Sequence, residues 1–295
     1  LKAPAAGVPL ASFPTALYLP PPAMVAEGRD RSRSRTPERD PIVEAAREQL
    51  RELCIKHNIP ESHGREHAER VLGHAELALA AVQPALPAAR QLAVRLAALL
   101  HDVDDRKYFP GCPKGQYPNA KRIMEEVGAE AQVVSDALLM ISLVSCSANG
   151  NSVPPFALAA PELLWPRWAD RLEATGEIGV VRCWQYNAEV GSELCTPSTP
   201  RPQSEAEVWE LATPERFEKY QTSGGQSASM MDHYYDKLLR VAKPPSEILR
   251  NAYFEAEMAR RSAPLVEMCL AFGETGEVPE GKLRAMAERL KAKDC

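Results

Sequence analysis

The sequence predicts an all-α protein. From residue 41 onward, apolar residues recur every three or four positions, which is the spacing of one face of a helix. No segment shows a convincing apolar–polar alternation of the kind that marks a strand, and no internal repeat is evident. Proline, glycine and polar clusters separate the apolar stretches, as in connections between helices. We therefore expect one all-α domain over 41–295.

The expected helices follow one another along the chain. Pro41 suits the first turn of the first helix, where no N–H partner is needed. Ser62 suits the N-cap of the second, with Glu66 near the capping-box position. Pro84 and Pro87 end that helix, and 196–205 is a Pro- and Ser-rich loop or insertion. Helices are expected at 41–58, 63–82, 88–103, 117–128, 129–144, 160–175, 176–190, 204–212, 214–221, 230–242 and 246–272.

Residues 1–40 have a different composition. They hold seven prolines and the run "RDRSRSRTPERD". Such a segment cannot bury enough apolar surface to offset the entropy of ordering, so we expect a disordered Pro-rich and Arg/Ser-rich leader over 1–40. The Arg/Ser run is open to several interpretations: a solvated basic tail, a phosphorylation target, a nuclear signal or a weak RNA contact.

The composition narrows the function classes. A chain of 295 residues with 45% hydrophobic and 25% charged residues is ordinary for a globular protein. Its net charge of −5 creates no overall attraction to nucleic acid or anionic lipid. The seven cysteines form no CxxC pair, which indicates reduced thiols. No apolar run approaches the ~20 residues of a membrane span. We expect a cytoplasmic protein without a membrane partner; a nuclear location through the Arg/Ser run is the alternative.

The stretch "ALLHDVDDRKYF" carries charge at the end of a strongly apolar helix. His101, Asp102, Asp104 and Asp105 follow directly after Leu100. A solvated helix end is one interpretation of this charge. The other is half of a metal site, because imidazoles and carboxylates are common ligands of divalent metals.

A mononuclear metal site needs further ligands from other elements. His67 on the second expected helix could meet the pair His101–Asp102. Asp170 lies among large apolar residues in "LLWPRWADRLEATG", where an unpaired carboxylate would be costly to bury. Its partner is either the adjacent Arg171 or a cation.

Four separate motifs resemble one known family. "SHGREHAERV", "HDVDDRK", "ADRLEATG" and "HYYDKLL" are similar to motifs of the HD superfamily of metal-dependent phosphohydrolases, in particular its stand-alone single-domain members, over roughly 44–275. The resemblance implies an HD-domain helical bundle and metal ligands at His67, His101, Asp102 and Asp170. It also implies one divalent ion (Mn, Mg, Co, Ni, Fe or Zn). Dinuclear members need histidines before the last ligand, and this chain has none between 102 and 232.

The resemblance also suggests roles around the metal. Asp105 corresponds to the acidic residue that relatives use on the attacking water, so we expect it to be the general base. The neighbouring Asp104 is the rival candidate for this role, and we expect it instead to be a solvated acid of the turn. Cations are needed for phosphate, and solvent exposure is the competing interpretation for each candidate. The candidate substrate-binding residues are Arg70, Lys107, Lys237 and His63.

The sequence thus predicts a metal-dependent phosphohydrolase acting on a small phosphorylated molecule, with a nucleotide as the favoured substrate. Pyrophosphohydrolase and 5′-nucleotidase activities both fit the resemblance. The alternative is a catalytically silent HD module that binds metal or nucleotide and regulates another protein. A third hypothesis is an RNA-associated protein that acts through the leader.

Overall fold

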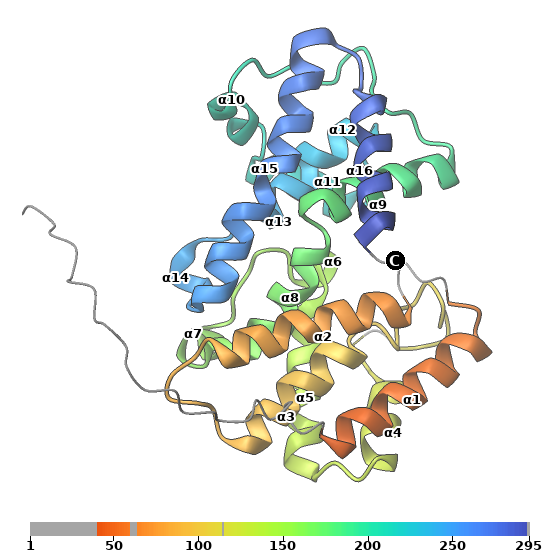
Figure 1. The fold of residues 1–295 in the computed structure, drawn as a ribbon, viewed down its shortest axis with the longest axis vertical. Coiled ribbons are helices and arrows are strands. Elements are labelled where there is room, and N and C mark those ends of the chain that lie inside the picture. Colours follow the sequence, from red (N-terminus) through yellow and green to blue (C-terminus); the bar gives the residue numbers. More distant parts are fainter. Residues whose placement is uncertain (1–39, 60–63, 114, 294–295) are drawn as a thin grey trace, which may run out of the picture. The chain divides into compact units, whose positions relative to one another are not determined.

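The computed structural model describes residues 40–59, 64–113 and 115–293, which fold into helices joined by loops (Figure 1). Within these ranges no strand forms, so the prediction of an all-α protein is confirmed. Asp40 begins the described chain by capping the first helix, since its Oδ1 accepts the Ile42 N–H at 2.9 Å. The rest of the predicted leader lies outside the described residues.

Helices from the first half of the domain build one hydrophobic core. The most central is α3, which packs against α1, α2, α5 and α8 and buries side chains on almost every side. A helix that is apolar all round is stable only when it is surrounded by protein. The elements of this half are α1 (Pro41–Lys56), α2 (Arg65–Ala80), α3 (Ala88–Leu100), α4 (Pro118–Glu126), α5 (Ala131–Val144), α6 (Cys146–Asn149), α7 (Pro155–Ala159), the 3₁₀ helix η1 (Pro161–Leu164) and α8 (Trp165–Glu173). We call their buried apolar side chains, together with Leu249, Phe254 and Met258, the first core.

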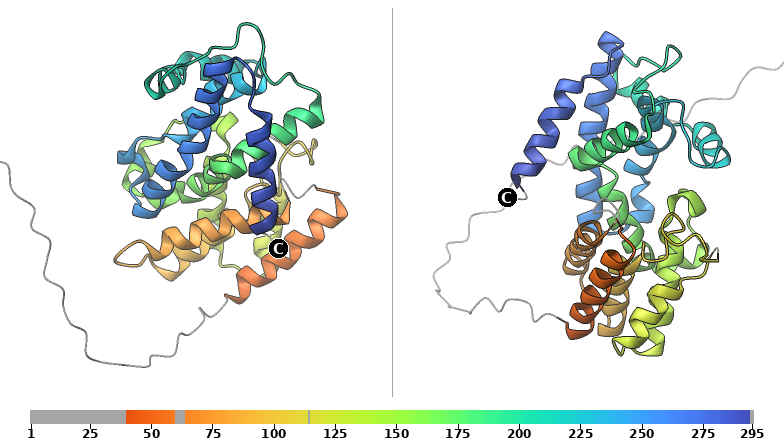
Figure 2. Two further views of the ribbon diagram at one scale, coloured as in Figure 1. Left: turned by 45° about the horizontal axis from the view of Figure 1, so that its top comes forward. Right: turned by 90° about the vertical axis from the view of Figure 1, so that its right-hand side faces the viewer.

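The remaining helices build a second core. In this half α9 lies beside both α15 and α16 (Figure 2). The elements are α9 (Gly176–Val190), α10 (Glu205–Glu210), α11 (Pro214–Thr222), α12 (Met230–His233), the π-helical turn η2 (Tyr234–Leu238), α13 (Leu239–Ala242), α14 (Ser246–Leu249), α15 (Ala252–Thr275) and α16 (Glu280–Lys293). The second core comprises the buried apolar side chains of α9, α10, α12, η2, α13, α15 and α16.

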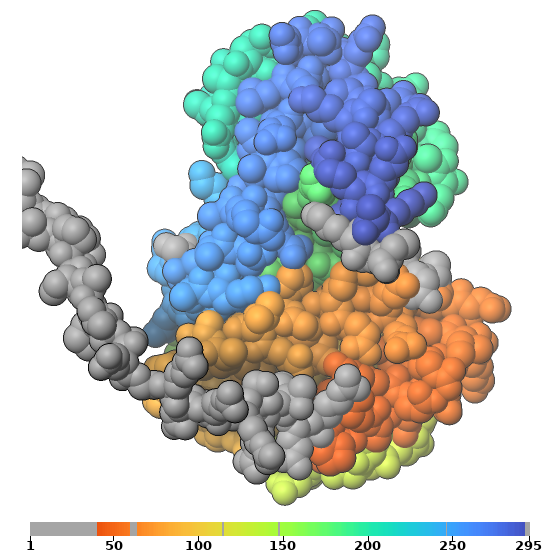
Figure 3. Space-filling model, viewed as in Figure 1, coloured from red at the N-terminus to blue at the C-terminus, as the bar shows by residue number. Residues whose placement is uncertain are grey.

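Helix α15 takes part in both cores. Phe254 and Met258, near its start, are buried in the first core, whereas Leu265 and Phe272 are buried in the second. The beginning of α15 lies directly on α2, as the space-filling view shows (Figure 3). This helix therefore links the two cores mechanically.

The structure corrects the prediction for 246–272, which was expected to be one helix. The chain breaks after α14 because Asn251 caps a new helix: its Oδ1 accepts the N–H groups of Tyr253 and Phe254. The Asn251 Nδ2 also donates to the Ala78 carbonyl oxygen of α2 at 3.0 Å. The preceding Arg250 takes a left-handed backbone conformation with φ of 45°, which ends α14.

Helix α16 was not predicted. Its sequence is rich in charged residues, and only a few apolar side chains mark a helix face. Leu283 and Met286 on that face are buried in the second core. Tertiary packing therefore stabilises a helix whose own pattern is weak. Across the described residues, none of the helices combines the length and apolar character needed to span a bilayer.

Candidate metal centre

Helix α2 places His67 at the junction of three helices. His67 is 2% exposed and lies where α2 packs against α3 and α8. Its Nε2 atom lies 3.3 Å from His101 Nε2 and 3.3 Å from Asp170 Oδ1. A histidine seven residues later, His74, is on the same face of α2 and is also buried.

The end of α3 delivers His101 and Asp102. The Nδ1 atom of His101 lies 2.9 Å from the Ala98 carbonyl oxygen. Because a carbonyl oxygen only accepts, Nδ1 carries the hydrogen, and Nε2 of the neutral ring presents its lone pair to the site. This arrangement, in which a backbone acceptor orients an imidazole, is the usual one for a metal-binding histidine.

Helix α8 supplies Asp170. Its Oδ1 lies 3.3 Å from His67 Nε2 and 3.7 Å from His101 Nε2. Its neighbour Arg171 points elsewhere and donates to the Gly150 carbonyl oxygen and to Asn151 Oδ1. Of the two partners weighed for Asp170 from the sequence, the structure shows Arg171 occupied by these other acceptors.

His67, His101 and Asp102 bring their donor atoms close enough together to hold one cation. Asp102 Oδ2 is 3.5 Å from His101 Nε2 and 3.8 Å from His67 Nε2, and the ligand atoms of these three residues all lie within 4.8 Å of one another. A cation held about 2.1 Å from each donor separates adjacent ligands by about 3.0 to 3.4 Å and opposite ones by about 4.2 Å. The observed separations fit such a cation.

The electrostatics of the site also favour a cation. Two imidazole nitrogens 3.3 Å apart cannot both present lone pairs, so a proton or a metal ion must lie between them. Burial opposes a charge on His101, yet the carboxylates of Asp102 and Asp170 raise its pKa well above the usual value. Burial likewise opposes the charge of Asp170, and hydrogen bonds with His101 and His67 nevertheless hold its pKa well below the usual value. A divalent ion would replace this shared proton.

The centre is open on its carboxylate side. The side chains of His67 and His101 are 2% and 1% exposed, whereas those of Asp102 and Asp170 are each 30% exposed. Solvent or a ligand can therefore reach the carboxylates while the imidazoles stay enclosed. A metal held here would keep coordination positions facing outward.

Of the remaining acids in the turn, Asp105 follows directly after Asp104. It is half-buried, its N–H donates to the Asp102 carbonyl oxygen at 3.0 Å, and its Oδ1 accepts the Lys107 N–H at 2.9 Å. The charges of Asp105 and Asp102 both act on the phenol of Tyr108, whose pKa burial raises. The role of Asp105 as general base stays a prediction.

Asp104 is not the solvated acid that was expected. It is 7% exposed, and its two carboxylate oxygens accept the N–H groups of Asn119 and Ala120, each at 2.9 Å. Asn119 Nδ2 returns a hydrogen bond to the Val103 carbonyl oxygen at 3.0 Å. Asp104 therefore ties the turn after α3 to the first residues of α4. A carboxylate that satisfies helix N–H groups is stabilising at that end of a helix.

The predicted substrate-binding residues have different surroundings. Arg70 is half-buried, and its Nε lies 2.6 Å from Glu173 Oε2. Lys107 is exposed. Lys237 is half-buried in η2, with Nζ 5.8 Å from the centre of the Tyr220 ring. His63 lies outside the described residues.

Lys237 is the predicted cation whose charge acts on the centre. Burial would lower its pKa, but neighbours that include Tyr220, Cys146 and Asp170 raise it above the usual value. The π-helical geometry of η2 interrupts what was expected to be one regular helix over 230–242. Such turns often mark functional positions.

Sequence reasoning missed Arg182 and Glu173. Arg182 of α9 donates to the Glu173 carbonyl oxygen at 3.1 Å, and its charge acts on Tyr108. The Glu173 side chain is 2% exposed and accepts from α2 and α15. The apolar pattern around "RLEATG" would have flagged Glu173 as a buried carboxylate that needs partners.

Comparison with known proteins finds a related viral sequence and solved structures with a similar fold. No family model matches the sequence. An uncharacterized protein of Acanthamoeba polyphaga mimivirus, L803, is 34% identical over 235 residues, which cover 76% of this chain and 93% of the viral protein. A solved structure from Lactobacillus plantarum is 23% identical with a TM-score of 0.54, covering 78% of this chain and 94% of that one. An HD-superfamily hydrolase from Bacillus thuringiensis is 19% identical with a TM-score of 0.47, covering 76% and 93%. The likeness to the Lactobacillus protein shows a shared fold.

Proposed function

Because the chain belongs to one family with the mimivirus protein L803 and has an HD-type fold, we propose that it is a metal-dependent phosphohydrolase. The observation that carries the proposal is the convergence of two imidazoles and two carboxylates from α2, the end of α3, and α8. His67, His101, Asp102 and Asp170 would hold one divalent ion. When bound, such an ion lowers the pKa of a water and neutralises charge that develops on a phosphate.

Other residues of the chain would supply the proton acceptor and the cations that bind phosphate. Asp105, in the turn after α3, would orient the attacking water and accept its proton. Lys237 would pair with a phosphate oxygen, because its charge already acts on Asp170. Arg182 is a second cation for the same purpose, since its charge acts on Tyr108 beside the acidic turn. Lys107 and His63 remain candidates for substrate contact.

Arg70 differs from the other candidate phosphate ligands because two carboxylates already pair with it. Its guanidinium is already engaged by the buried carboxylate of Glu173, and also by Glu66 at 3.8 Å. Phosphate binding would have to compete with the Glu173 pair, whose Nε–Oε2 distance is 2.6 Å. We therefore place Lys237 and Arg182 ahead of Arg70 for this role.

We propose a small phosphorylated substrate, and a nucleotide in particular. The partly exposed carboxylates of the centre and the charge of Lys237, which acts on Asp170, suit hydrolysis of a phosphate ester or anhydride. Release of pyrophosphate from a nucleoside triphosphate and release of phosphate from a monophosphate both fit this arrangement. The two reactions differ in their products and are separated by measurement.

The test is an activity screen with purified protein. Nucleoside mono-, di- and triphosphates are incubated with each of Mn, Mg, Co, Ni, Fe and Zn, and phosphate and pyrophosphate are quantified separately. We expect turnover with at least one metal, and its loss in His101→Ala and Asp102→Ala. His57→Ala is the matched control, because His57 is an exposed histidine at the end of α1. Metal binding without turnover anywhere in the panel would contradict the enzyme and favour a regulatory HD module. Removal of residues 1–40 should leave turnover intact, whereas an RNA-associated protein acting through them would lose its function.

A further inference from the structure

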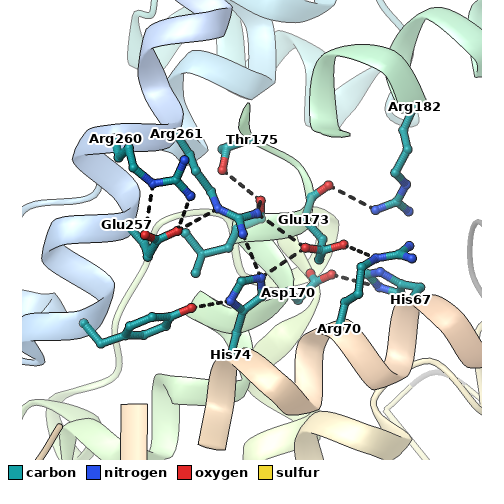
Figure 4. A network of polar contacts seen from close by, with 12 residues as sticks. His67, Arg70, His74, Asp170, Glu173, Thr175, Arg182, Glu257, Arg260 and Arg261 are labelled. Atoms are coloured by element: carbon teal, nitrogen blue, oxygen red, sulfur yellow. Dashed lines mark hydrogen bonds and ion pairs between the residues drawn. The ribbon is translucent and has the colours of Figure 1, made fainter. Parts of the chain in front are cut away.

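A buried carboxylate lies one helical turn after Asp170. Glu173 is 2% exposed, although it ends the helix that carries the candidate ligand (Figure 4). Its oxygens lie 2.6 Å from Arg70 Nε, 3.1 Å from His74 Nε2 and 3.4 Å from Arg261 Nη1. A buried charge is tolerated only when partners compensate for its lost hydration. Burial opposes the charge of Glu173, yet its hydrogen bonds with His74 and Arg70 lower its pKa to about 2.

The partners on α2 repeat the spacing of the candidate ligands. Arg70 comes three residues after His67, as Glu173 comes three residues after Asp170. Residues at this spacing lie on the same side of a helix. The contact between His67 and Asp170 at 3.3 Å is therefore followed, one turn along both helices, by the contact between Arg70 and Glu173 at 2.6 Å. The second pair braces α2 against α8 next to the first pair.

Helix α15 completes the brace from the opposite side. Arg261 donates to the Leu172 carbonyl oxygen at 2.9 Å, and its Nη2 lies 3.1 Å from His74 Nε2 (Figure 4). Glu257 accepts from Arg261 Nε at 3.0 Å and orients the guanidinium. Since α15 also packs in the second core, the end of α8 is held by both cores.

Glu173 is too deeply buried to act on a substrate directly. Its effect must therefore pass through the helices that it joins. We propose that Glu173 is a positioning residue that sets the separation of His67 and Asp170 by bracing α2 against α8, and that it thereby sets the affinity of the centre for its cation. This inference rests on the proposed function, since it assumes that the centre binds a metal ion. Metal affinity is sensitive to such support because ligands must be held within about 0.5 Å of their productive geometry.

The experiment measures Mn²⁺ binding to the purified full chain by titration calorimetry, well below the unfolding temperature. Glu173→Gln removes the charge at nearly constant volume, and we expect its Kd for Mn²⁺ to rise at least about 10-fold. Arg70→Gln should raise the Kd in the same direction. The double variant should bind Mn²⁺ no more weakly than the weaker-binding single variant, because both substitutions remove the same contact between Arg70 and Glu173. Glu177→Gln should leave the Kd unchanged, since Glu177 pairs with Arg289 of α16 at an exposed site.

A purely structural role predicts another result. In that case Glu173→Gln would lower the melting temperature and bind Mn²⁺ with the wild-type Kd, which would overturn the inference. Should Glu173→Gln fail to fold, Arg70→Gln decides, because the Arg70 side chain is 35% exposed and Glu173 keeps His74 and Arg261 as partners. An Arg70→Gln protein with a raised KM and a wild-type Kd for Mn²⁺ would also overturn the inference and make Arg70 a phosphate ligand. Absence of Mn²⁺ binding in the wild-type protein is a different outcome, which overturns the proposed function and the inference with it.

Discussion

The two cores of the domain differ in the polar groups that they bury. In the first core the buried or half-buried polar groups include the imidazoles and carboxylates of the candidate centre, which face one another. In the second core Asp232 is buried, but it accepts from Thr199, Ser229 and Arg216 and is saturated by them. A buried acid with all its acceptors satisfied needs no further ligand, whereas acids and imidazoles that lie close together leave room for a cation.

This difference assigns separate tasks to the two regions. The first core holds the four candidate ligands on α2, α3 and α8, which are rigid because they pack against one another. The second half of the domain carries Lys237, whose charge acts on Asp170, and Arg182, whose charge acts on Tyr108. We infer that the first core determines metal binding and that the second core determines substrate affinity. Three predictions test this division.

The largest effect is expected from a ligand carboxylate. Asp170→Asn keeps the shape of the side chain but removes its charge, so the centre should lose metal affinity, and kcat/KM should fall about 10³-fold, equivalent to ~4 kcal/mol. Steady-state kinetics and calorimetry with Mn²⁺ measure both quantities.

The matched control lies in the second core. Asp232→Asn also removes a buried charge, and it should cost about 1 to 3 kcal/mol of stability while the Kd for Mn²⁺ stays at the wild-type value. The division between the cores would be broken if Asp232→Asn weakened metal binding as strongly as Asp170→Asn.

An intermediate effect is expected on the acid stability of the first core. The folded state holds the pKa of Glu173 at about 2, below its ordinary value of 4.5. Because the folded pKa is the lower one, this carboxylate stabilises the fold fully above pH 4.5, and the contribution is lost as the pH falls toward 2. The maximum contribution is ~3 kcal/mol. Urea unfolding at pH 7 and pH 3 measures it.

A comparison with Glu173→Gln isolates this contribution. The variant has no charge to lose, so its stability should fall less between pH 7 and pH 3 than that of the wild-type protein. Equal losses in the two proteins would show that other carboxylates cause the acid sensitivity of the first core.

The smallest effect is expected from a cation of the second core. Lys237→Gln should raise KM about 10-fold, since a charge-assisted hydrogen bond to phosphate is worth ~1.5 kcal/mol. Its kcat and its Kd for Mn²⁺ should change little. Lys243→Gln is the control, because Lys243 is exposed and lies over the Trp209 ring at 4.5 Å. A wild-type KM in Lys237→Gln would remove Lys237 from substrate binding and leave Arg182 as the candidate from the second core.

Much of the helical framework follows from local pattern. The apolar spacing of 41–58 and 88–103 predicts helices that the structure places at Pro41–Lys56 and Ala88–Leu100. The unpredicted α16 shows the limit of such patterns, because its few apolar residues become informative only against α9. The break at Asn251 has a similar cause, since the side chain that caps α15 is also held by the Ala78 carbonyl oxygen.

The residues of the candidate centre were identifiable for a different reason. His101, Asp102 and Asp170 are ionisable residues next to strongly apolar stretches, where they are costly to bury without a purpose. His67 was predicted as a histidine on the preceding helix that could meet them. Their assignment as ligands remains a prediction, while their convergence is a finding of the structure. Asp104 lies in the same stretch and was expected to be solvated. Its true role depends on Asn119 and Ala120, fifteen and sixteen residues away.

By itself, the sequence determined the all-α class and the positions of most helices, and it predicted four side chains as ligands of a cation. These features depend on residue type and on spacing within a helix, which are local properties. Only the tertiary structure decided the partners: Glu173 with Arg70 and His74, Asp104 with α4, and Lys237 near Asp170. These contacts join segments far apart in the chain, and their geometry is set by how the helices pack, which periodicity within a single helix does not specify.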